Sequence, residues 1–180
     1  MLRVARMKHI LSFNFQNHEV MENIVIIVIE DQREVLQAIG KDLVILEGGF
    51  LVEECESTAE ARQVMDAIDA AGDYVALIIS DQVMPNQTGV DFLIEVHNDS
   101  RFTGTRKMLL TGLATHRDTI EAINKASIDK YISKPWKTDE LIESVKTLVT
   151  EFILEKGIDY TKYIDLLDKQ VLFDKLRKTT

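Results

Sequence analysis

Ser80-Asp81-Gln82-Val83-Met84-Pro85-Asn86-Gln87-Thr88-Gly89 is the stretch that decides the fold of this chain. The residues before it, 74–79, form a short apolar run with β-branched members, which is typical of a strand buried on both faces of a sheet. Asp81 therefore follows at the carboxyl end of this predicted strand. Ligands bind at that edge of open α/β sheets, so Asp81 is the first candidate for a functional residue.

Three further predicted strands also end in polar residues. Residues 24–29 lead into Glu30-Asp31, residues 108–110 lead into Thr111-Gly112, and residues 131–133 lead into Lys134-Pro135. A fifth strand is predicted over residues 50–55. Because the carboxyl ends of parallel strands lie at one edge of a sheet, we expect the polar residues to face a common crevice.

Helical patterns alternate with these strands. Apolar spacing predicts helices over residues 33–47, 90–98 and 115–126, and Ser57 with Glu60 forms a capping box that begins a helix ending near residue 71. Thr138 is predicted to cap a further helix. The alternation predicts an α/β fold with a doubly wound, five-stranded parallel sheet, helices on both faces and right-handed crossovers.

The predicted crevice would bring three carboxylates together, from Glu30, Asp31 and Asp81. At about 5 Å and an effective dielectric constant near 20, each pair repels by about 3 kcal/mol, so the cluster needs a cation or must protonate. Mg²⁺ suits such a cluster, because it binds one or two carboxylates and keeps waters beside a phosphate. An isolated Glu30-Asp31 pair would instead be read as a cap of the following helix.

The motif Asp81-x-x-Met84-Pro85-x-x-x-Gly89, with Glu30-Asp31, Thr111 and Lys134-Pro135, resembles the receiver domain of two-component response regulators, which has a flavodoxin-like fold. The resemblance spans residues 22–155, and all four motifs occur in the family's order. It implies a phosphoacceptor at Asp81, with Mg²⁺ held by Glu30, Asp31, Asp81 and the backbone carbonyl of Val83.

The resemblance also assigns roles to residues that mean little alone. Lys134 and Thr111 would contact the phosphoryl group, the Lys134–Pro135 bond would be cis, and Thr111 with Tyr131 would form the switch pair. Taken alone, Lys134 is a solvated lysine, Thr111 a strand threonine and Tyr131 a half-buried strand tyrosine. The implied partners are a sensor histidine kinase or phosphotransfer protein and a downstream protein target.

Val83 and Leu113 occupy positions that modulate dephosphorylation in the family, and both are apolar. We therefore expect slow self-dephosphorylation and no enzymatic activity beyond self-phosphorylation from a donor. A phosphatase of the haloacid dehalogenase type is an alternative, but it requires a second Asp where Val83 stands. Another alternative, suggested by Lys134-Pro135-Trp136, is a receiver acting as a module of a cyclic-dinucleotide phosphodiesterase system.

Composition limits the classes of partner. The net charge is −9, and residues 22–136 carry twenty acidic against ten basic side chains. Such a body repels phosphate backbones, so direct nucleic-acid binding is not expected. The single cysteine, Cys55, excludes an internal disulfide, and no apolar run approaches the roughly 20 residues of a membrane span. We therefore expect a cytoplasmic protein without membrane insertion.

The predicted organisation has three parts: a leader of unknown role over 1–21, a receiver over 22–156 and a helical extension over 157–180. Apolar residues recur at helical intervals from Asp159 to Lys178, which predicts one amphipathic helix. An isolated helix of this length is marginal in water unless its apolar face is covered. The helix would either fold back on its own receiver or pair with a second copy, and the prediction slightly favours a homodimer.

Overall fold

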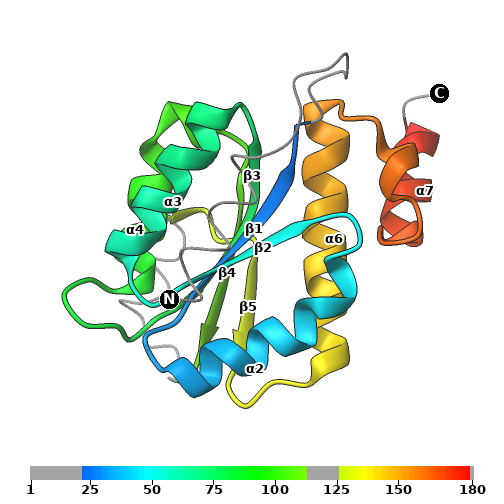
Figure 1. The fold of residues 1–180 in the computed structure, drawn as a ribbon. Helices are drawn as coiled ribbons and strands as arrows, with labels where there is room; N and C mark the ends of the chain where they lie inside the picture. The colour runs from blue at the N-terminus through cyan, green and yellow to red at the C-terminus, as the bar shows by residue number, and fades with distance from the viewer. Residues whose placement is uncertain (1–21, 113–125, 179–180) are drawn as a thin grey trace.

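Five parallel strands form one sheet in the computed structural model, which describes residues 22–112 and 126–178 (Figure 1). The order across the sheet is β2-β1-β3-β4-β5. This arrangement confirms the predicted doubly wound parallel sheet. The strands are β1 (Ile24–Ile29), β2 (Leu51–Cys55), β3 (Tyr74–Asp81), β4 (Arg106–Thr111) and β5 (Lys130–Ser133).

Helices cover both faces of the sheet. The helices α2 and α6 pack on one face, while α3 and α4 pack on the other. All six side chains of β1 are buried. They point alternately to the two faces of the sheet, so three of them pack in each hydrophobic core. The described helices are α2 (Arg33–Leu43), α3 (Thr58–Ala71), α4 (Gly89–Asn98), α6 (Thr138–Lys156) and α7 (Lys169–Lys178), with 3₁₀ turns η1 (Val44–Leu46), η2 (Ser100–Phe102) and η3 (Tyr160–Tyr163).

The predicted helix over 33–47 was too long. The α-helix ends at Leu43, and residues 44–46 continue as the 3₁₀ turn η1. Val44 and Ile45 are β-branched, which lowers their helix propensity, and the tighter turn places Leu46 in the core while both of them stay exposed. The Gly48-Gly49 pair then leads into β2.

Of the two predicted helix caps, one is confirmed and one is wrong. The Ser57 side chain accepts a hydrogen bond from the Glu60 amide, 3.2 Å away, although the Glu60 carboxylate accepts from the Glu56 amide instead of that of Ser57. Thr138 does not cap α6, whose N-cap is Lys137 without a side-chain hydrogen bond. The Thr138 hydroxyl donates a hydrogen bond to Asp42, which lies near the C-terminus of α2.

The predicted continuous helix over Asp159–Lys178 was also wrong, because the segment divides into η3 and α7. It folds back on its own receiver beside α6 (Figure 1). The Tyr163 ring stacks on Phe50 with centroids 5.4 Å apart, and Leu167 is buried in the core that contains α6. The segment therefore folds back on its own receiver, which was one of the two predicted alternatives, while Ile164 of the predicted apolar face stays 43% exposed.

Several expectations lie outside the described residues. They are the leader over 1–21, most of the predicted helix over 115–126, and Leu113. Within the described parts of the chain, no helix is both long enough and apolar enough to cross a membrane.

Candidate functional site

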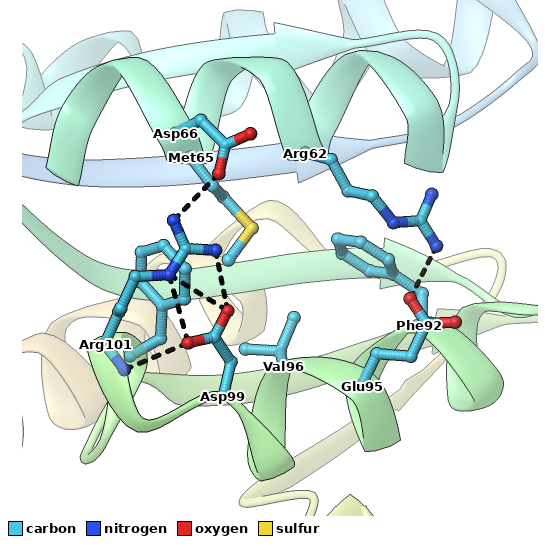
Figure 2. Close-up of a pocket in the computed structure, with 9 residues that line it drawn as sticks. Arg62, Met65, Asp66, Phe92, Glu95, Val96, Asp99 and Arg101 are labelled. Carbon is cyan, nitrogen blue, oxygen red and sulfur yellow. Dashed lines mark hydrogen bonds and ion pairs between the residues drawn. The ribbon is translucent and has the colours of Figure 1, made fainter. Parts of the chain in front are cut away.

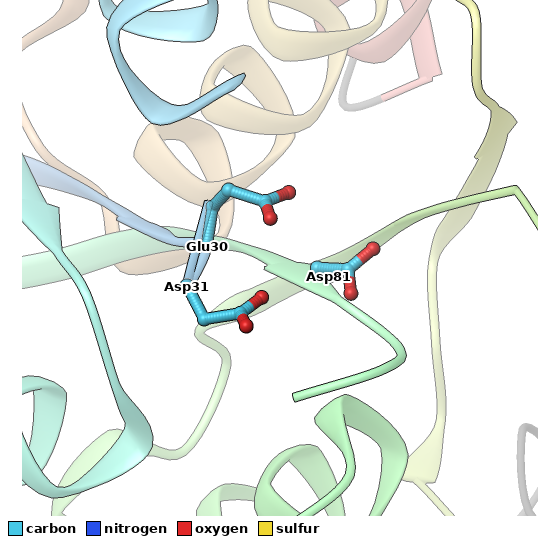
Figure 3. Close-up of side chains that lie close together, drawn as sticks. All are labelled: Glu30, Asp31 and Asp81. Atoms are coloured by element: carbon cyan, nitrogen blue, oxygen red, sulfur yellow. The ribbon is translucent and has the colours of Figure 1, made fainter. Parts of the chain in front are cut away.

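The three predicted carboxylates converge at the carboxyl edge of the sheet (Figure 3). Glu30 and Asp31 follow β1, and Asp81 ends the neighbouring β3. Carboxylate oxygens of the three residues all lie within 4.8 Å of one another. Glu30 is fully buried and Asp81 is only 6% exposed, so these two carboxylates are largely shielded from solvent.

Lys134 joins this cluster from the end of β5. Its ammonium donates to Asp81 Oδ1 at 2.7 Å and to Glu30 Oε2. Its backbone amide donates to the Thr111 carbonyl oxygen at 2.9 Å, and the following Lys134–Pro135 bond is cis, as predicted. One cation therefore bridges the two buried carboxylates that come from different strands.

Burial and charge pairing act against each other here. Burial raises the pKa of Glu30, although the hydrogen bond from Lys134 partly counters it. Burial also disfavours the charged Lys134 ammonium, but its hydrogen bonds to Asp81 and Glu30 outweigh burial and raise its pKa. Lys134 therefore stays charged and leaves the set of three carboxylates with an excess of negative charge.

Asp31 supplies direct support for a cation. Its Oδ1 atom is buried and has no hydrogen-bond partner among the described residues. A buried polar atom without a partner costs free energy unless something else satisfies it. Three carboxylates against one ammonium also leave about two negative charges, which a hard divalent cation with oxygen ligands would balance. The residues present thus fit a divalent cation.

The loop after β3 holds Asp81 in place. The Val83 amide donates to Asp81 Oδ2 at 2.7 Å, while the Val83 side chain is 58% exposed. A Cβ atom on Gly89 would lie 1.9 Å from the Asp81 carbonyl oxygen, so only glycine permits α4 to start this close to β3. The role of the Val83 carbonyl as a metal ligand stays a prediction.

The two predicted switch residues lie on adjacent strands. Thr111 ends β4 and is 2% exposed, beside Ser133 of β5. Tyr131 lies opposite Leu109 and is half-buried against the core on the α3–α4 face. Both are therefore near the edge that carries the carboxylates, and their role as a switch stays a prediction.

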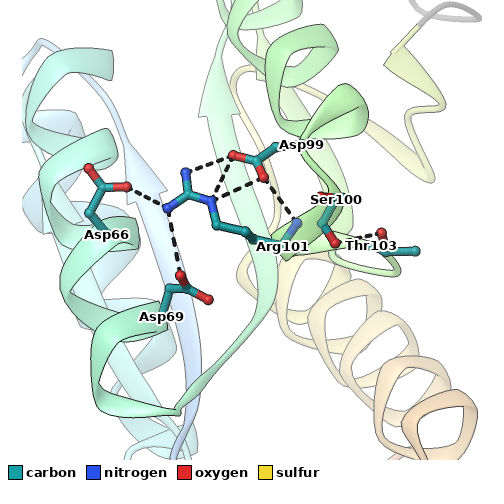
Figure 4. A network of polar contacts seen from close by, with 6 residues as sticks. All are labelled: Asp66, Asp69, Asp99, Ser100, Arg101 and Thr103. Carbon is teal, nitrogen blue, oxygen red and sulfur yellow. Dashed lines mark hydrogen bonds and ion pairs between the residues drawn. The ribbon is translucent and has the colours of Figure 1, made fainter.

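A hollow of about 180 Å³ lies between α3 and α4, away from the carboxylates (Figure 2). Its floor is apolar, and Arg62 pairs with Glu95 across it at 2.6 Å. Arg101 pairs with Asp66 and Asp99 and lies 3.7 Å from Asp69 (Figure 4). Both guanidinium groups are thus paired within the hollow, where they join α3 to α4 and η2.

Sequence reasoning missed one residue near the site, Asp42. It accepts hydrogen bonds from the Trp136 indole and the Thr138 hydroxyl, at 2.9 and 3.1 Å. Only the tilt of α2 across the sheet brings Asp42 to these residues, and no local sequence signal marks it.

A family model described as the response regulator receiver domain matches residues 26–146. Among curated relatives, the hydrogenase transcriptional regulatory protein HoxA of Bradyrhizobium diazoefficiens is 30% identical over 131 residues, 73% of this chain but 25% of HoxA. Chemotaxis protein CheY1 of Helicobacter pylori is 28% identical over 123 residues, 68% of this chain and 95% of CheY1. The chain thus spans about a quarter of the length of HoxA.

Solved structures agree with this match. The signal receiver domain of an HD domain-containing protein from Pseudomonas fluorescens Pf-5 superposes with a TM-score of 0.62 at 25% identity, over 73% of this chain and 98% of that chain. A CheY-like receiver domain protein from Methanospirillum hungatei JF-1 gives a TM-score of 0.63 at 22% identity, over 74% and 99%. The second likeness concerns the fold alone.

Proposed function

This chain belongs to the response regulator receiver domain family, and from that premise we propose that it is a phosphoacceptor of a two-component phosphorelay, phosphorylated on Asp81. One observation carries the assignment. Asp81 is a buried carboxylate at a strand end, 2.7 Å from the Lys134 ammonium and beside Glu30 and Asp31. Glu30 shares Lys134 and the acidic neighbours, but it is fully buried, whereas Asp81 keeps 6% of its surface exposed.

In the proposed reaction, an Asp81 carboxylate oxygen attacks the phosphorus of a phosphohistidine or small phosphodonor. An acyl phosphate bond forms while the bond from phosphorus to the donor breaks, and the donor leaves with that electron pair. Phosphoryl transfer depends mostly on positioning and charge neutralisation. Lys134 already contacts Asp81 and provides positive charge, and the Thr111 hydroxyl would donate to the phosphoryl oxygens.

Mg²⁺ is the proposed cofactor. Glu30, Asp31 and Asp81 would hold it, together with the Val83 backbone carbonyl, and the unpartnered Asp31 oxygen supports this. When bound, Mg²⁺ would neutralise charge on the transferring phosphoryl group. The Lys134 ammonium contacts the carboxylates of both Glu30 and Asp81. Lys134 therefore orients Glu30 as well as Asp81.

The proposed output is a change in a protein-interaction surface near Thr111 and Tyr131, read by a downstream protein. An acyl phosphate adds charge and acceptor oxygens at Asp81, which can draw in a hydroxyl and let an aromatic ring follow. HoxA is named as a transcriptional regulator and CheY1 as a chemotaxis protein, so the family serves different outputs. The acidic charge of this chain disfavours binding to nucleic-acid backbones, and we propose protein partners, such as a histidine kinase, and a cytoplasmic location.

A phosphatase of the haloacid dehalogenase type, the first alternative, needs a general acid two residues after Asp81, and the Val83 side chain at that position has no proton to donate. We therefore propose that the chain has no enzymatic turnover beyond accepting and slowly losing its phosphoryl group. A role as a module of a cyclic-dinucleotide phosphodiesterase system stays the second alternative.

Homodimerisation through the C-terminal segment also stays a prediction. Because Leu167 and Leu172 are already buried within the single chain, a second copy would have to use the exposed residues Ile164, Phe173 and Leu176. Sedimentation of the full chain against a version ending at Lys156 tests this. A monomer in both cases would contradict the dimer.

The central experiment incubates the protein with Mg²⁺ and acetyl phosphate and measures its intact mass. We expect a gain of one phosphoryl group that disappears in Asp81→Ala and persists in the control Glu143→Gln, an exposed carboxylate on α6. Unchanged labelling of Asp81→Ala would refute the assignment of the acceptor.

A further inference from the structure

One carboxylate, Asp42, holds the chain segment that follows Lys134. The Trp136 indole N–H donates to Asp42 Oδ2 at 2.9 Å, and the Thr138 hydroxyl donates to Asp42 Oδ1 at 3.1 Å. The two donors lie just after the Lys134–Pro135 bond and at the start of α6. Both oxygens of Asp42 are therefore used on the same short segment.

Asp42 is itself fixed relative to the acidic pair. The helix α2 starts two residues after Asp31, and the Gln32 amide donates to Glu30 Oε1 at 3.2 Å. Three of its side chains, Leu36, Ile39 and Leu43, are buried in the core. The helix thus extends as a packed unit from the carboxylate cluster to Asp42 (Figure 1).

The turn that carries Lys134 is consequently held on both sides. Before the turn, the Lys134 amide donates to the Thr111 carbonyl oxygen of β4 at 2.9 Å. After the turn, Asp42 holds Trp136, whose ring also packs partly against the core. Between these two attachments, the Lys134 ammonium reaches Glu30 and Asp81.

We propose that Asp42 is a positioning residue of the phosphorylation site, which holds Lys134 against Asp81 by fixing the turn through Trp136 and Thr138. This inference rests on the proposed function of Asp81. A charged acceptor makes stronger hydrogen bonds than a neutral one, so a carboxylate is better suited than an amide to hold two donors. Loss of the carboxylate frees the turn and disperses the position of the Lys134 ammonium.

The test compares Asp42→Asn with Glu143→Gln, which makes the same change of charge on an exposed part of α6. With saturating Mg²⁺ and acetyl phosphate, we expect Asp42→Asn to slow phosphorylation of Asp81 about tenfold, because small displacements of positioned groups cost up to about a hundredfold in rate. Glu143→Gln should react at the wild-type rate. Trp136→Phe keeps an aromatic ring, although a smaller one, and removes the N–H donor, so it should slow the reaction in the same direction even if Asp42→Asn folds poorly.

Two measurements separate positioning from a general loss of structure. Without Mg²⁺ or phosphodonor, hydrogen exchange of the Trp136 and Lys137 amides should be faster in Asp42→Asn, while exchange in β1 and β3 stays unchanged. In a Lys134→Ala background, Asp42→Asn should cause no further loss of rate, because residues that act through one another are not additive. Equal loss in both backgrounds would show that Asp42 only supports the fold.

The outcomes also separate this inference from the proposed function. Failure of the wild type to gain a phosphoryl group would remove the proposed function, and the positioning role with it. A phosphorylated wild type with equally fast Asp42→Asn and unchanged exchange of the turn would overturn the positioning role alone.

Discussion

Replacement of Asp31 by asparagine should stabilise the metal-free protein and remove its response to Mg²⁺. The side chain keeps its shape and loses its charge. Its ligand atoms lie within 4.8 Å of those of Glu30 and Asp81, where each pair of charges repels by about 3.5 kcal/mol at an effective dielectric constant near 20. Lys134 offsets much of this repulsion, so we expect a net gain of about 1–2 kcal/mol in the free energy of unfolding.

Mg²⁺ should stabilise the wild type more than the variant. A cation that binds only the folded wild type stabilises it by about 2.7 kcal/mol at a concentration a hundred times the dissociation constant. Asp31→Asn loses a ligand whose Oδ1 atom has no protein partner, so its stabilisation by the same Mg²⁺ concentration should fall below about 1 kcal/mol.

Urea unfolding at a series of Mg²⁺ concentrations measures both effects, and Trp136, the only tryptophan, provides the fluorescence signal beside the site. Glu143→Gln is the matched control and should behave as the wild type in both conditions. If Asp31→Asn keeps the full Mg²⁺ response, Asp31 is not a ligand. If the metal-free variant is less stable than the wild type, the assumed repulsion is wrong.

Three other predictions concern residues around this site. Lys107 is 6% exposed, and burial lowers its pKa from 10.5, so the folded chain binds fewer protons at Lys107 than the unfolded chain and the free energy of unfolding should rise with pH up to about 10.5. Lys107→Met should remove this rise and add about 1 kcal/mol to the free energy of unfolding at neutral pH, measured in urea. A less stable variant would contradict the reasoning. Asp168→Ala should lower the free energy of unfolding by about 1–2 kcal/mol in the same assay, because the Asp168 carboxylate accepts hydrogen bonds from the Thr147 hydroxyl and the Gln170 amide. An unchanged unfolding midpoint would show that these hydrogen bonds do not stabilise the fold. Phosphorylation should alter hydrogen exchange in β5 around Tyr131, and identical exchange in free and phosphorylated protein would count against the switch.

The carboxylate cluster could be predicted from the sequence because it follows from topology. Once 24–29 and 74–79 are read as parallel strands, Glu30 and Asp81 must lie at one edge of the sheet. The apolar runs specify these strands strongly, since β1 is buried on both faces. Neither conclusion needs any knowledge of side-chain orientation.

Contacts that depend on the tilt of a helix could not be predicted in this way. Asp42 and Trp136 are 94 positions apart, and their hydrogen bond exists only because α2 crosses toward the start of α6. The local sequence around Thr138 favours a helix cap, yet its hydroxyl donates to Asp42. A tertiary partner outweighed the local preference.

The C-terminal segment shows the limit of periodicity most clearly. Helical spacing identified Leu167 and Leu172 as residues that face a partner, and both are buried. Spacing does not reveal whether the backbone hydrogen bonds run without a break. Asp168 lies between these two residues, and its amide donates to the Thr150 hydroxyl while its carboxylate accepts from Thr147. The η3 turn ends at Tyr163 and α7 begins at Lys169, directly after Asp168. Because Thr147 and Thr150 of α6 bond the Asp168 side chain and amide, the segment packs beside α6 as two short elements and not as one continuous helix.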